Sequence, residues 1–210
     1  MIITIGRQLG SGGREIGKKL AETMNIAYYD KEILDLTAKE SGFNQELFDR
    51  MDERVQKGFL AGLRGMHFPV WGDNNHMTGY GGLSNEMLFQ LQSDVIRETA
   101  DKQSCVFIGR CADYILRDRK DCLNVFICAN EENRIKRIID NSEQKTVSEE
   151  KARDLMAQVD KRRATYYSYY TNKTWGVASS YHICLNSSVT GINGAVSLIR
   201  EIAEKMYNVV

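Results

Sequence analysis

Short runs of hydrophobic residues alternate with longer segments in which hydrophobic residues recur every three or four positions. The short runs have the length of β-strands, and the longer segments have the period of amphipathic helices. This alternation is typical of β-α-β units and predicts an α/β fold with a parallel sheet flanked by helices. The five runs expected to form strands are Ile2 to Ile5, Ala27 to Tyr29, Cys105 to Ile108, Leu123 to Cys128 and Tyr181 to Leu185.

Helical periodicity covers much of the remaining chain. In the first helical segment the apolar residues Ile16, Leu20 and Met24 fall on one face. The expected helices are Arg14 to Met24, Lys31 to Lys39, Gln45 to Gln56, Ser84 to Lys102, Asn133 to Ile139 and Val189 to Met206. Three of them lie between the second and third strands, so this part of the chain is expected to be largely helical.

The segment from Gly58 to Gly82 follows neither pattern. It holds seven glycines and the single proline of the chain, Pro69. Loops of this length are usually lids over active sites or disordered segments, and an inert surface excursion fits the composition equally well. Because nothing requires a second core, the sequence predicts one domain, residues 1–210, with a flexible loop insertion at 58–82.

Composition narrows the range of functions. The 28 basic and 28 acidic residues balance, so no global field attracts nucleic acid or an anionic membrane, and any phosphate site must be local. The apolar runs are far shorter than the roughly 20 residues that span a bilayer, and the N-terminal segment has no signal-like pattern. We therefore expect a soluble cytoplasmic protein that binds neither nucleic acid nor membranes.

The five cysteines and three histidines give no sign of catalytic or metal chemistry. The cysteines form no C-x-x-C pair, and three of them lie in strand-like runs, where cysteine packs as a small hydrophobic residue. Their odd number, without a signal peptide, indicates reduced thiols. The histidines are scattered along the sequence, so a zinc site or a Cys/His pair has no support.

The first predicted strand leads directly into a glycine-rich turn, GRQLGSGGREIG (residues 6–17), which opens the first helix. This order is typical of phosphate-binding loops, because glycines let backbone N–H groups point inward and the helix N-terminus adds partial positive charge. We expect the loop to hold the phosphates of a nucleotide. The residues expected to bind it are Gly10, Ser11, Gly12, Gly13, Arg14 and Glu15.

The loop departs from the full phosphate-binding pattern G-x-x-x-x-G-K-[S/T]. If Gly10 and Gly12 occupy the usual glycine positions, Gly13 stands in place of the lysine. Glu15 then lies near the position of the expected metal-binding hydroxyl. Arg7 and Arg14 flank the loop. Either one is a candidate for the missing cation, because guanidinium binds phosphate oxygens in a bidentate manner. Ordinary surface charge at a turn is the alternative.

A dinucleotide-binding fold also joins a strand to a glycine turn and a helix. It requires G-x-G-x-x-G at the turn and an acidic residue roughly 20 residues further on. The turn lacks that spacing, and Asp30 is the sole acidic candidate. The dinucleotide alternative therefore fits less well than a P-loop.

Polar residues also follow two other predicted strands. Asp30 follows the second strand, and Gly109 and Arg110 follow the third. Because parallel strands end at a common edge, these residues are expected on the same side as the loop. Asp30 then faces an acceptor or magnesium, or it caps the next helix. Arg110 points toward a bound phosphate, or it pairs with Asp113.

Two further segments carry charges at helical spacing. Arg134 and Arg137 are three residues apart and, taken alone, indicate a solvated helix surface. Asp160 and Arg163 share a helix face, so the carboxylate is able to fix the guanidinium and present it to a phosphate or a base edge. The tyrosine-rich stretch that follows, residues 166–170, is expected to pack in a core or a lid.

Together these features resemble the cytidylate-kinase-like family of bacterial P-loop kinases. The segments that carry the resemblance are ITIGRQLGSGGREIGKKLAE, IAYYDKEIL, VFIGRCADYIL, ENRIKRI and DKRRATYYSYYTNKTWG. They are spread over most of the chain, and the combination of the first with the last is the most distinctive. The resemblance implies a three-layer P-loop kinase fold with a five-stranded parallel sheet, a helical acceptor-binding insertion and a lid.

The resemblance also implies ATP as the phosphoryl donor, Mg²⁺ as the metal and a small nucleotide as the acceptor, with cytidine monophosphate (CMP) the leading candidate. It implies that Arg134 and Arg137 lie near the lid and close over the donor. The acceptor-binding residues that it implies are Arg110, Asp113, Asp160 and Arg163, and Asp30 is expected to join them because of its place at the end of the second strand. The phosphate loop is where this sequence departs most from true cytidylate kinases.

We therefore predict a phosphotransferase in which alignment, exclusion of water and neutralisation of charge supply most of the catalysis. The expected catalytic cations are Arg7, Arg14, Arg110 and Arg163. Two alternatives stay open: a nucleotide-sensing module that has lost efficient transfer, and a kinase for another small metabolite.

Overall fold

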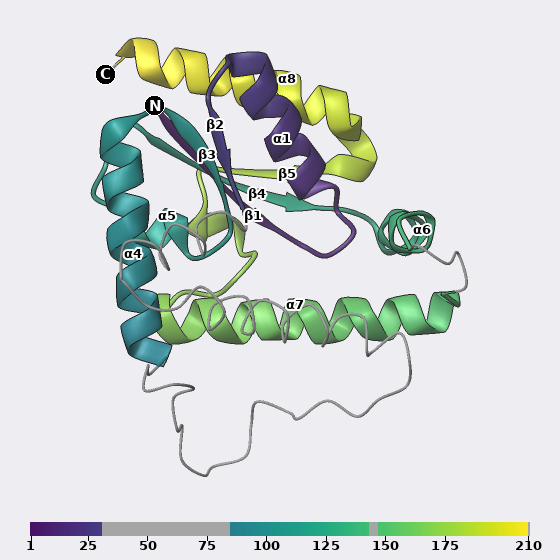
Figure 1. Ribbon diagram of the computed structural model, residues 1–210. Helices are drawn as coiled ribbons and strands as arrows, with labels where there is room; N and C mark the ends of the chain where they lie inside the picture. Colours follow the sequence, from purple (N-terminus) through teal and green to yellow (C-terminus); the bar gives the residue numbers. More distant parts are fainter. Residues whose placement is uncertain (31–84, 143–146, 210) are drawn as a thin grey trace. The chain divides into compact units, whose positions relative to one another are not determined.

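The structure is a computed structural model, and it describes residues 1–30, 85–142 and 147–209 (Figure 1). The chain divides into two compact units, one formed by residues 1–30 and 100–210 and the other by residues 31–99. All the residues of the predicted site belong to the first unit. The predicted helices Lys31 to Lys39 and Gln45 to Gln56, and the predicted loop Gly58 to Gly82, lie outside the described residues.

The first unit contains a five-stranded sheet. Its strands are β1 (Ile2–Arg7), β2 (Ala27–Tyr29), β3 (Cys105–Ile108), β4 (Cys122–Cys128) and β5 (Ile183–Asn186). They lie in the order β2-β3-β1-β4-β5, and each neighbouring pair is parallel. The prediction of five parallel strands is confirmed, with small shifts at the strand ends. The fifth strand, for example, begins at Ile183 rather than at Tyr181.

Strand β1 lies at the centre of the sheet, paired with β3 on one side and β4 on the other. Ile2, Ile3 and Ile5 are completely buried. Strands covered on both faces are hydrophobic at nearly every position instead of alternating, and this explains why the run at the start of the sequence is continuous.

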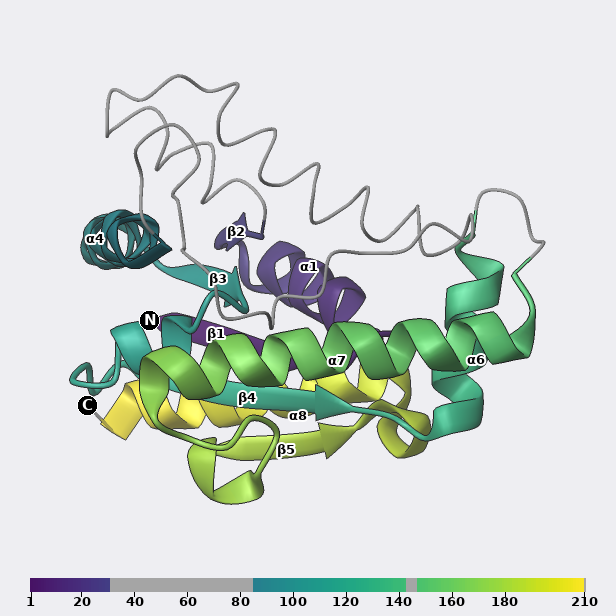
Figure 2. The same cartoon turned by 90° about the horizontal axis from the view of Figure 1, so that it is seen from below.

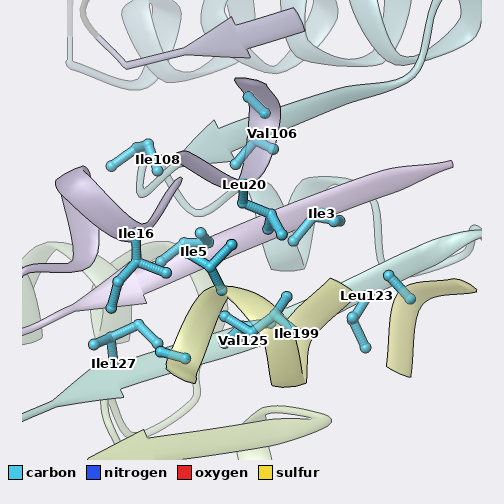
Figure 3. Close-up of a cluster of buried hydrophobic side chains, with 14 residues drawn as sticks. Ile3, Ile5, Ile16, Leu20, Val106, Ile108, Leu123, Val125, Ile127 and Ile199 are labelled. Atoms are coloured by element: carbon cyan, nitrogen blue, oxygen red, sulfur yellow. The ribbon is translucent and has the colours of Figure 1, made fainter. Parts of the chain in front are cut away.

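One face of the sheet is covered by α1 (Gly13–Met24) and α8 (Ser187–Val209). Ile16 and Leu20 of α1 and Ile199 of α8 are fully buried there. Figure 3 shows these three side chains with their sheet partners Ile3, Ile5, Val106, Ile108, Leu123, Val125 and Ile127. Complete burial of one such side chain stabilises the fold by roughly 1.5 to 3 kcal/mol, so this cluster fixes the position of α1 and of the loop that precedes it.

The turn between α1 and β2 is short because Asn25 adopts a left-handed conformation, with φ 51°. Asparagine tolerates this conformation better than most residues. Its N–H bonds to carbonyls of the last helical turn, and the N–H of Ile26 bonds to the Ala21 carbonyl at 3.0 Å. The chain therefore reverses at once into β2, and Asp30 follows that strand directly.

The opposite face of the sheet carries α5 (Ala112–Ile115) and α7 (Glu149–Thr171). Figure 2 shows α7 in front of β1 and β4, with α8 behind them. Phe126 of β4 faces this side, and its ring lies 5.1 Å from Trp175 and 4.9 Å from Tyr181, between ring centroids. The short elements α6 (Glu131–Asp140) and η2 (Ala178–Ser180) complete the unit.

The described part of the second unit is α4 (Asn85–Lys102) up to Thr99. This helix matches the predicted one at Ser84 to Lys102. Its exposed residue Asp94 accepts hydrogen bonds from Gln90, one turn earlier, and from Arg97, one turn later. Among the helices that the structure describes, none is both long and apolar enough to cross a membrane.

Candidate functional site

The glycine loop joins β1 to α1 along a path that only glycine follows easily. Gly10 and Gly12 have φ angles of 75° and 78°, in the left-handed region. A Cβ atom on Gly10 would also lie 2.6 Å from the carbonyl oxygen of Arg134. Gly10 is therefore required both by its backbone conformation and by the close approach of α6.

Two charged side chains, buried Arg134 and largely buried Asp160, hold the loop from outside. Asp160 of α7 accepts a hydrogen bond from the N–H of Leu9 at 2.9 Å, and Arg134 of α6 donates from Nε to the carbonyl of Leu9 at 2.7 Å. Arg134 and Asp160 also form an ion pair with each other. Both polar groups of one loop residue are thus satisfied by a charged pair from two different helices.

A second set of contacts holds the next two carbonyls. Arg137 donates to the Gly10 carbonyl at 3.3 Å and to Ser187 Oγ at 3.2 Å. Ser187, the first residue of α8, donates in turn to the carbonyl of Ser11 at 2.6 Å. Since N–H and C=O point in opposite directions across a planar trans peptide, the amides of Gly10 and Gly12 face away from these helices, toward the inside of the loop.

The start of α1 adds further donors. The N-cap residue, Gly12, has no side chain, so the cap position itself satisfies none of the N–H groups of the first helical turn. N–H groups of this kind are able to bind a ligand, and the helix end adds partial positive charge. Inward amides together with this helix N-terminus have the arrangement of an anion site of the P-loop type.

Arginines gather beside this loop. Arg7, at the end of β1, has a side chain only 15% exposed and lies 3.7 Å from Asp30, between Nη2 and Oδ1. Arg14 pairs with the other oxygen of Asp30 at 2.7 Å. Arg163 donates from Nη1 to the Arg7 carbonyl at 2.9 Å. Asp30, itself buried, is thus shared by the two arginines that flank the loop.

The electrostatics of Arg7 reflect this crowding. Burial and, after it, the charge of Arg163 lower the pKa of Arg7 to about 9, against the attraction of Asp30. Arg14 and Arg110 lower it further. Burial also lowers the pKa of Arg163 to about 10. With these pKa values Arg7 and Arg163 are both charged at neutral pH, and a bound anion would relieve their mutual repulsion.

One atom of Arg7 also indicates an anionic ligand. Its Nε is buried and has no hydrogen-bond partner among the described residues. A buried polar atom without a partner costs roughly 1 to 3 kcal/mol. An arginine held in this way is consistent with a ligand that supplies the missing acceptor.

The turn after β3 brings Arg110 near the cluster. Gly109, Arg110 and Cys111 have successive φ angles of 70°, 59° and 55°. Left-handed backbone is unfavourable for residues with a Cβ, by roughly 1 to 2 kcal/mol each, and such strain is concentrated at functional sites. Arg110 lies close enough to Arg7 for its charge to lower the pKa of Arg7.

Asp113 contacts a tyrosine and not Arg110, the partner that one of the sequence alternatives gave it. Its carboxylate accepts a hydrogen bond from the Tyr167 hydroxyl at 2.6 Å. Burial raises the pKa of Asp113, and the bond from Tyr167 partly opposes this. Within the part of the chain that the structure describes, Asp113 forms no ion pair with Arg110. Its predicted contact with the acceptor stays a prediction.

Glu15 is also placed away from its predicted partners. Its carboxylate is about half exposed and pairs with Lys19, one helical turn later, at 3.1 Å. The hydroxyl of Ser11 is used within the loop, where it donates to the Gln8 carbonyl at 2.9 Å. These contacts lie within the loop and the helix, so the predicted role of both side chains in binding the nucleotide stays a prediction. Their backbone amides still belong to the loop and to the first helical turn.

The predicted site residues therefore form two groups. Those that face one another beside the loop are Arg7, Arg14, Asp30, Arg110 and Arg163. Those that hold the loop are Arg134, Arg137 and Asp160. The contacts of Arg134 and Arg137 are with loop carbonyls, so their predicted approach to the donor nucleotide stays a prediction.

Sequence reasoning missed two residues of the site. Ser187 bridges Arg137 and Ser11, and the Gln8 side chain accepts a hydrogen bond from the N–H of Ala129 at 3.2 Å. A serine pair directly after the last strand is a helix-start signal that would have drawn attention to Ser187. No local signal marks Gln8. Among the described residues, no group of three or more His, Cys, Asp or Glu side chains is placed to hold a metal.

Comparison with known proteins supports the kinase fold. A model of the cytidylate kinase-like family matches residues 2–189. The crystal structure of an uncharacterized protein from Eubacterium ventriosum ATCC 27560 superposes with a TM-score of 0.70 at 28% identity, over 97% of this chain and 98% of that one. Shikimate kinase from Bacteroides thetaiotaomicron superposes with a TM-score of 0.54 at 14% identity, over 97% and 98% of the two chains. No curated protein matches the sequence.

The likeness to shikimate kinase concerns the fold alone: a five-stranded parallel sheet flanked by helices. The family match goes further, because it spans nearly the whole chain and includes the glycine loop, the arginines beside it and helix α7. The chain has the fold of P-loop kinases and belongs to the cytidylate kinase-like family.

Proposed function

We propose that this protein transfers the γ-phosphoryl group of ATP to a small phosphorylated acceptor, and that CMP is the leading acceptor. The observation that carries the proposal is the cluster of arginines beside a glycine loop whose amides face inward. We place this reaction in the cytoplasm, on a free nucleotide. Membership of a kinase-like family supports the reaction class.

The charges of the cluster favour anionic substrates. Among the described residues, Arg7 and Arg14 share the carboxylate of Asp30, and Arg163 shares that of Asp160 with Arg134. The charge of Arg110 adds to the positive potential at Arg7, and positive charges held this close repel one another unless an anion is bound. Phosphate suits the site because guanidinium groups bind its oxygens in a bidentate manner.

The donor end of the site fits a nucleotide triphosphate. The inward amides of Gly10 and Gly12 and the uncapped start of α1 provide the donors that phosphate oxygens require. Mg²⁺ is usually held by one or two carboxylates together with the substrate phosphates, and Asp30, which Arg7 and Arg14 share, is the carboxylate that we expect to face it. When bound, the ion would neutralise charge on the transferred group.

The acceptor end is expected at Arg110 and Arg163. Arg110 lies at the carboxyl end of β3, the strand next to β1, and Arg163 reaches Arg7 from α7. An acceptor that carries its own phosphate is already ionised at neutral pH, so no separate general base is needed. Alignment of the two phosphates and neutralisation of their charge supply the catalysis in this proposal.

A phosphotransfer panel tests the proposal. Purified protein is incubated with ATP and Mg²⁺ and, separately, with each nucleoside monophosphate, with shikimate and with other common metabolites. We expect ADP release that depends on the acceptor and is fastest with CMP, with CDP as the product. If another acceptor is phosphorylated fastest, the reaction class stands and CMP is wrong.

A nucleotide-sensing module is the second candidate, favoured by the absence of the P-loop lysine at Gly13. It predicts ATP binding without transfer. If calorimetry detects ATP binding and the panel detects no product with any acceptor, the sensing function replaces the kinase proposal.

A further inference from the structure

The missing lysine of the phosphate loop is accompanied by a second change, at position 7. In the pattern G-x-x-x-x-G-K-[S/T] the first glycine stands five residues before the second, and the lysine follows the second. When the second glycine is placed at Gly12, the first-glycine position is Arg7 and the lysine position is Gly13. A glycine has thus become a cationic residue, and the cationic residue has become a glycine.

The structure gives a steric reason for this exchange. A Cβ atom on Gly13 would lie 2.5 Å from Cβ and 3.1 Å from Cγ of Arg7, which is closer than such atoms approach. The backbone does not require glycine there, because Gly13 is not among the glycines with positive φ. Its next neighbour, Ile127 Cβ, is at an ordinary 3.6 Å. Only one of positions 7 and 13 therefore has room for a side chain.

A second glycine makes room for the other end of Arg7. A Cβ atom on Gly109, in the turn after β3, would overlap the guanidinium group of Arg7. The Arg7 side chain thus passes between two glycines, with Gly13 beside its base and Gly109 beside its charged end. Its Nε, buried and without a partner among the described residues, lies on this path.

We propose that Arg7 is the catalytic cation of this protein, that it replaces the P-loop lysine through the exchange of positions 7 and 13, and that Gly13 and Gly109 are positioning residues that make room for it. This inference rests on the proposed phosphotransfer. It chooses Arg7 over Arg14, whose side chain is 57% exposed and already bonded to Asp30 at 2.7 Å.

The test restores the ordinary arrangement. Four proteins are compared: the natural one, Arg7→Gly, Gly13→Lys and the double variant with both changes. The readouts are the affinity for ATP without acceptor, by titration calorimetry, and the initial rate of transfer to the best acceptor of the panel. Thermal unfolding of each protein shows that it is folded.

We expect Arg7→Gly to lower both the ATP affinity and the rate by about ten- to a hundredfold, the effect of losing one charge-assisted contact. Gly13→Lys alone should bind ATP poorly as well, because its Cβ meets Arg7. The double variant should recover most of the lost affinity. The proposal is overturned if the double variant is no better than Arg7→Gly, or if Gly13→Lys alone binds ATP as well as the natural protein.

A matched pair of glycine variants tests the same path without changing Arg7. Gly109 and Gly176 both have left-handed backbone, with φ 70° and 75°, so Gly→Ala strains both. The new Cβ meets the Arg7 guanidinium in Gly109→Ala and the Phe126 ring in Gly176→Ala. We expect Gly109→Ala alone to lose ATP affinity. Equal affinities in two folded variants would contradict a role for the Arg7 path, even where Arg7→Gly fails to fold.

These outcomes separate the inference from the proposed function. If ATP binding depends on Arg7 and the natural protein transfers phosphate to no acceptor, Arg7 replaces the lysine in nucleotide binding alone, and both the kinase proposal and the catalytic role of Arg7 fail. If transfer occurs and neither rate nor affinity depends on Arg7, the kinase proposal stands and the exchange fails. Absence of ATP binding by the natural protein overturns both.

Discussion

The side chain of Asp113 is partly buried, and its described partner is the hydroxyl of Tyr167. Burial raises its pKa above the ordinary value of 3.8, so the folded protein binds a proton there more readily than the unfolded chain does. The stability that this one group contributes is then fully present at pH values below 3.8 and is lost as the pH rises through the folded pKa. At neutral pH the ionised Asp113 is a net cost.

We therefore predict that Asp113→Asn raises the free energy of unfolding at pH 7, and that its advantage over the natural protein shrinks at pH 4. Urea unfolding at the two pH values measures this. Tyr167→Phe is the counterpart: it leaves the carboxylate without its donor and should lower stability by about 1 to 3 kcal/mol. A less stable Asp113→Asn at pH 7 would contradict the argument, and a raised KM for the acceptor would favour the predicted binding role.

The cysteines allow a second prediction at this scale. Burial raises the pKa of Cys105, Cys111 and Cys122 to about 12. It also raises the pKa of Cys184, but that residue, on β5, is exposed and so is accessible to a reagent. Because the thiolate is the reactive form, a thiol reagent at pH 8 should modify the native protein rapidly at one position, Cys184. All five thiols should react after denaturation. If Cys184→Ser keeps the rapid phase, another cysteine is accessible and the assignment is wrong.

Two ion pairs of α6 provide a comparison between helices. Arg134 pairs with Asp160 of α7 where the side chains are 10% and 16% exposed, and Arg153 of α7 pairs with Glu131 of α6 where they are 53% and 60% exposed. Removing one partner of a buried pair leaves an uncompensated charge, whereas an exposed pair contributes little.

We predict that Arg134→Ala lowers the free energy of unfolding by about 3 kcal/mol and weakens ATP binding, because it also releases the Leu9 carbonyl. Arg153→Ala, the control, should leave both properties close to those of the natural protein. Denaturant unfolding and calorimetry measure the two effects. Equal losses in both variants would show that the Arg134 contact does not hold the loop.

The elements differ in how well the sequence predicts them. The strands are hydrophobic at nearly every position, and α1 has one apolar face, so local patterns were sufficient. The sequence pattern does not give the bounds of helix α7, although it places Asp160 and Arg163 at helical spacing. Its first half packs Ala152 and Met156 against Ile135 of α6, and its second half packs Tyr167 against Tyr181, so it has no single apolar stripe.

Some residues of the site are also predictable from local sequence patterns, and others are not. The glycines and arginines of the loop could be found because strand, turn and helix are contiguous in the sequence. Other contacts of the site are not visible in the sequence. The folded sheet brings Gly109 beside Arg7 and Ser187 beside Ser11, although each pair is far apart in the chain. Gly13 is close to Arg7 in the chain, but their steric overlap depends on atomic positions. These contacts decide which arginine side chain fits beside the loop. A pattern of residue types in the sequence does not predict them.

At the scale of the whole molecule, charge is balanced, with 28 basic and 28 acidic residues. The excess positive charge beside the loop is therefore a local property within a neutral protein. Its repulsion is present in the folded state and absent in the unfolded chain, where the arginines are far apart. Any anion that fits the site should stabilise the whole fold.

We predict that ATP and inorganic tripolyphosphate raise the thermal unfolding midpoint, whereas adenosine at the same concentration does not. A ligand at 100 times its dissociation constant stabilises the folded state by about 2.7 kcal/mol. Thermal scans at increasing ligand concentration measure the effect, and Arg7→Gly should show a smaller shift. An equal shift with adenosine would place the main binding energy outside the phosphate loop.

The arrangement of positions 7 and 13 has a consequence for how such a loop evolves. A chain that moved by single substitutions between the lysine form and the form seen here would pass through one of two intermediates. One carries glycine at both positions and has no cation in the loop, and the other carries two side chains whose Cβ atoms collide. Both would be selected against, so each form should persist in its own lineage. Descendants of this protein are expected to keep Arg7 and Gly13 together or to lose the proposed phosphoryl transfer.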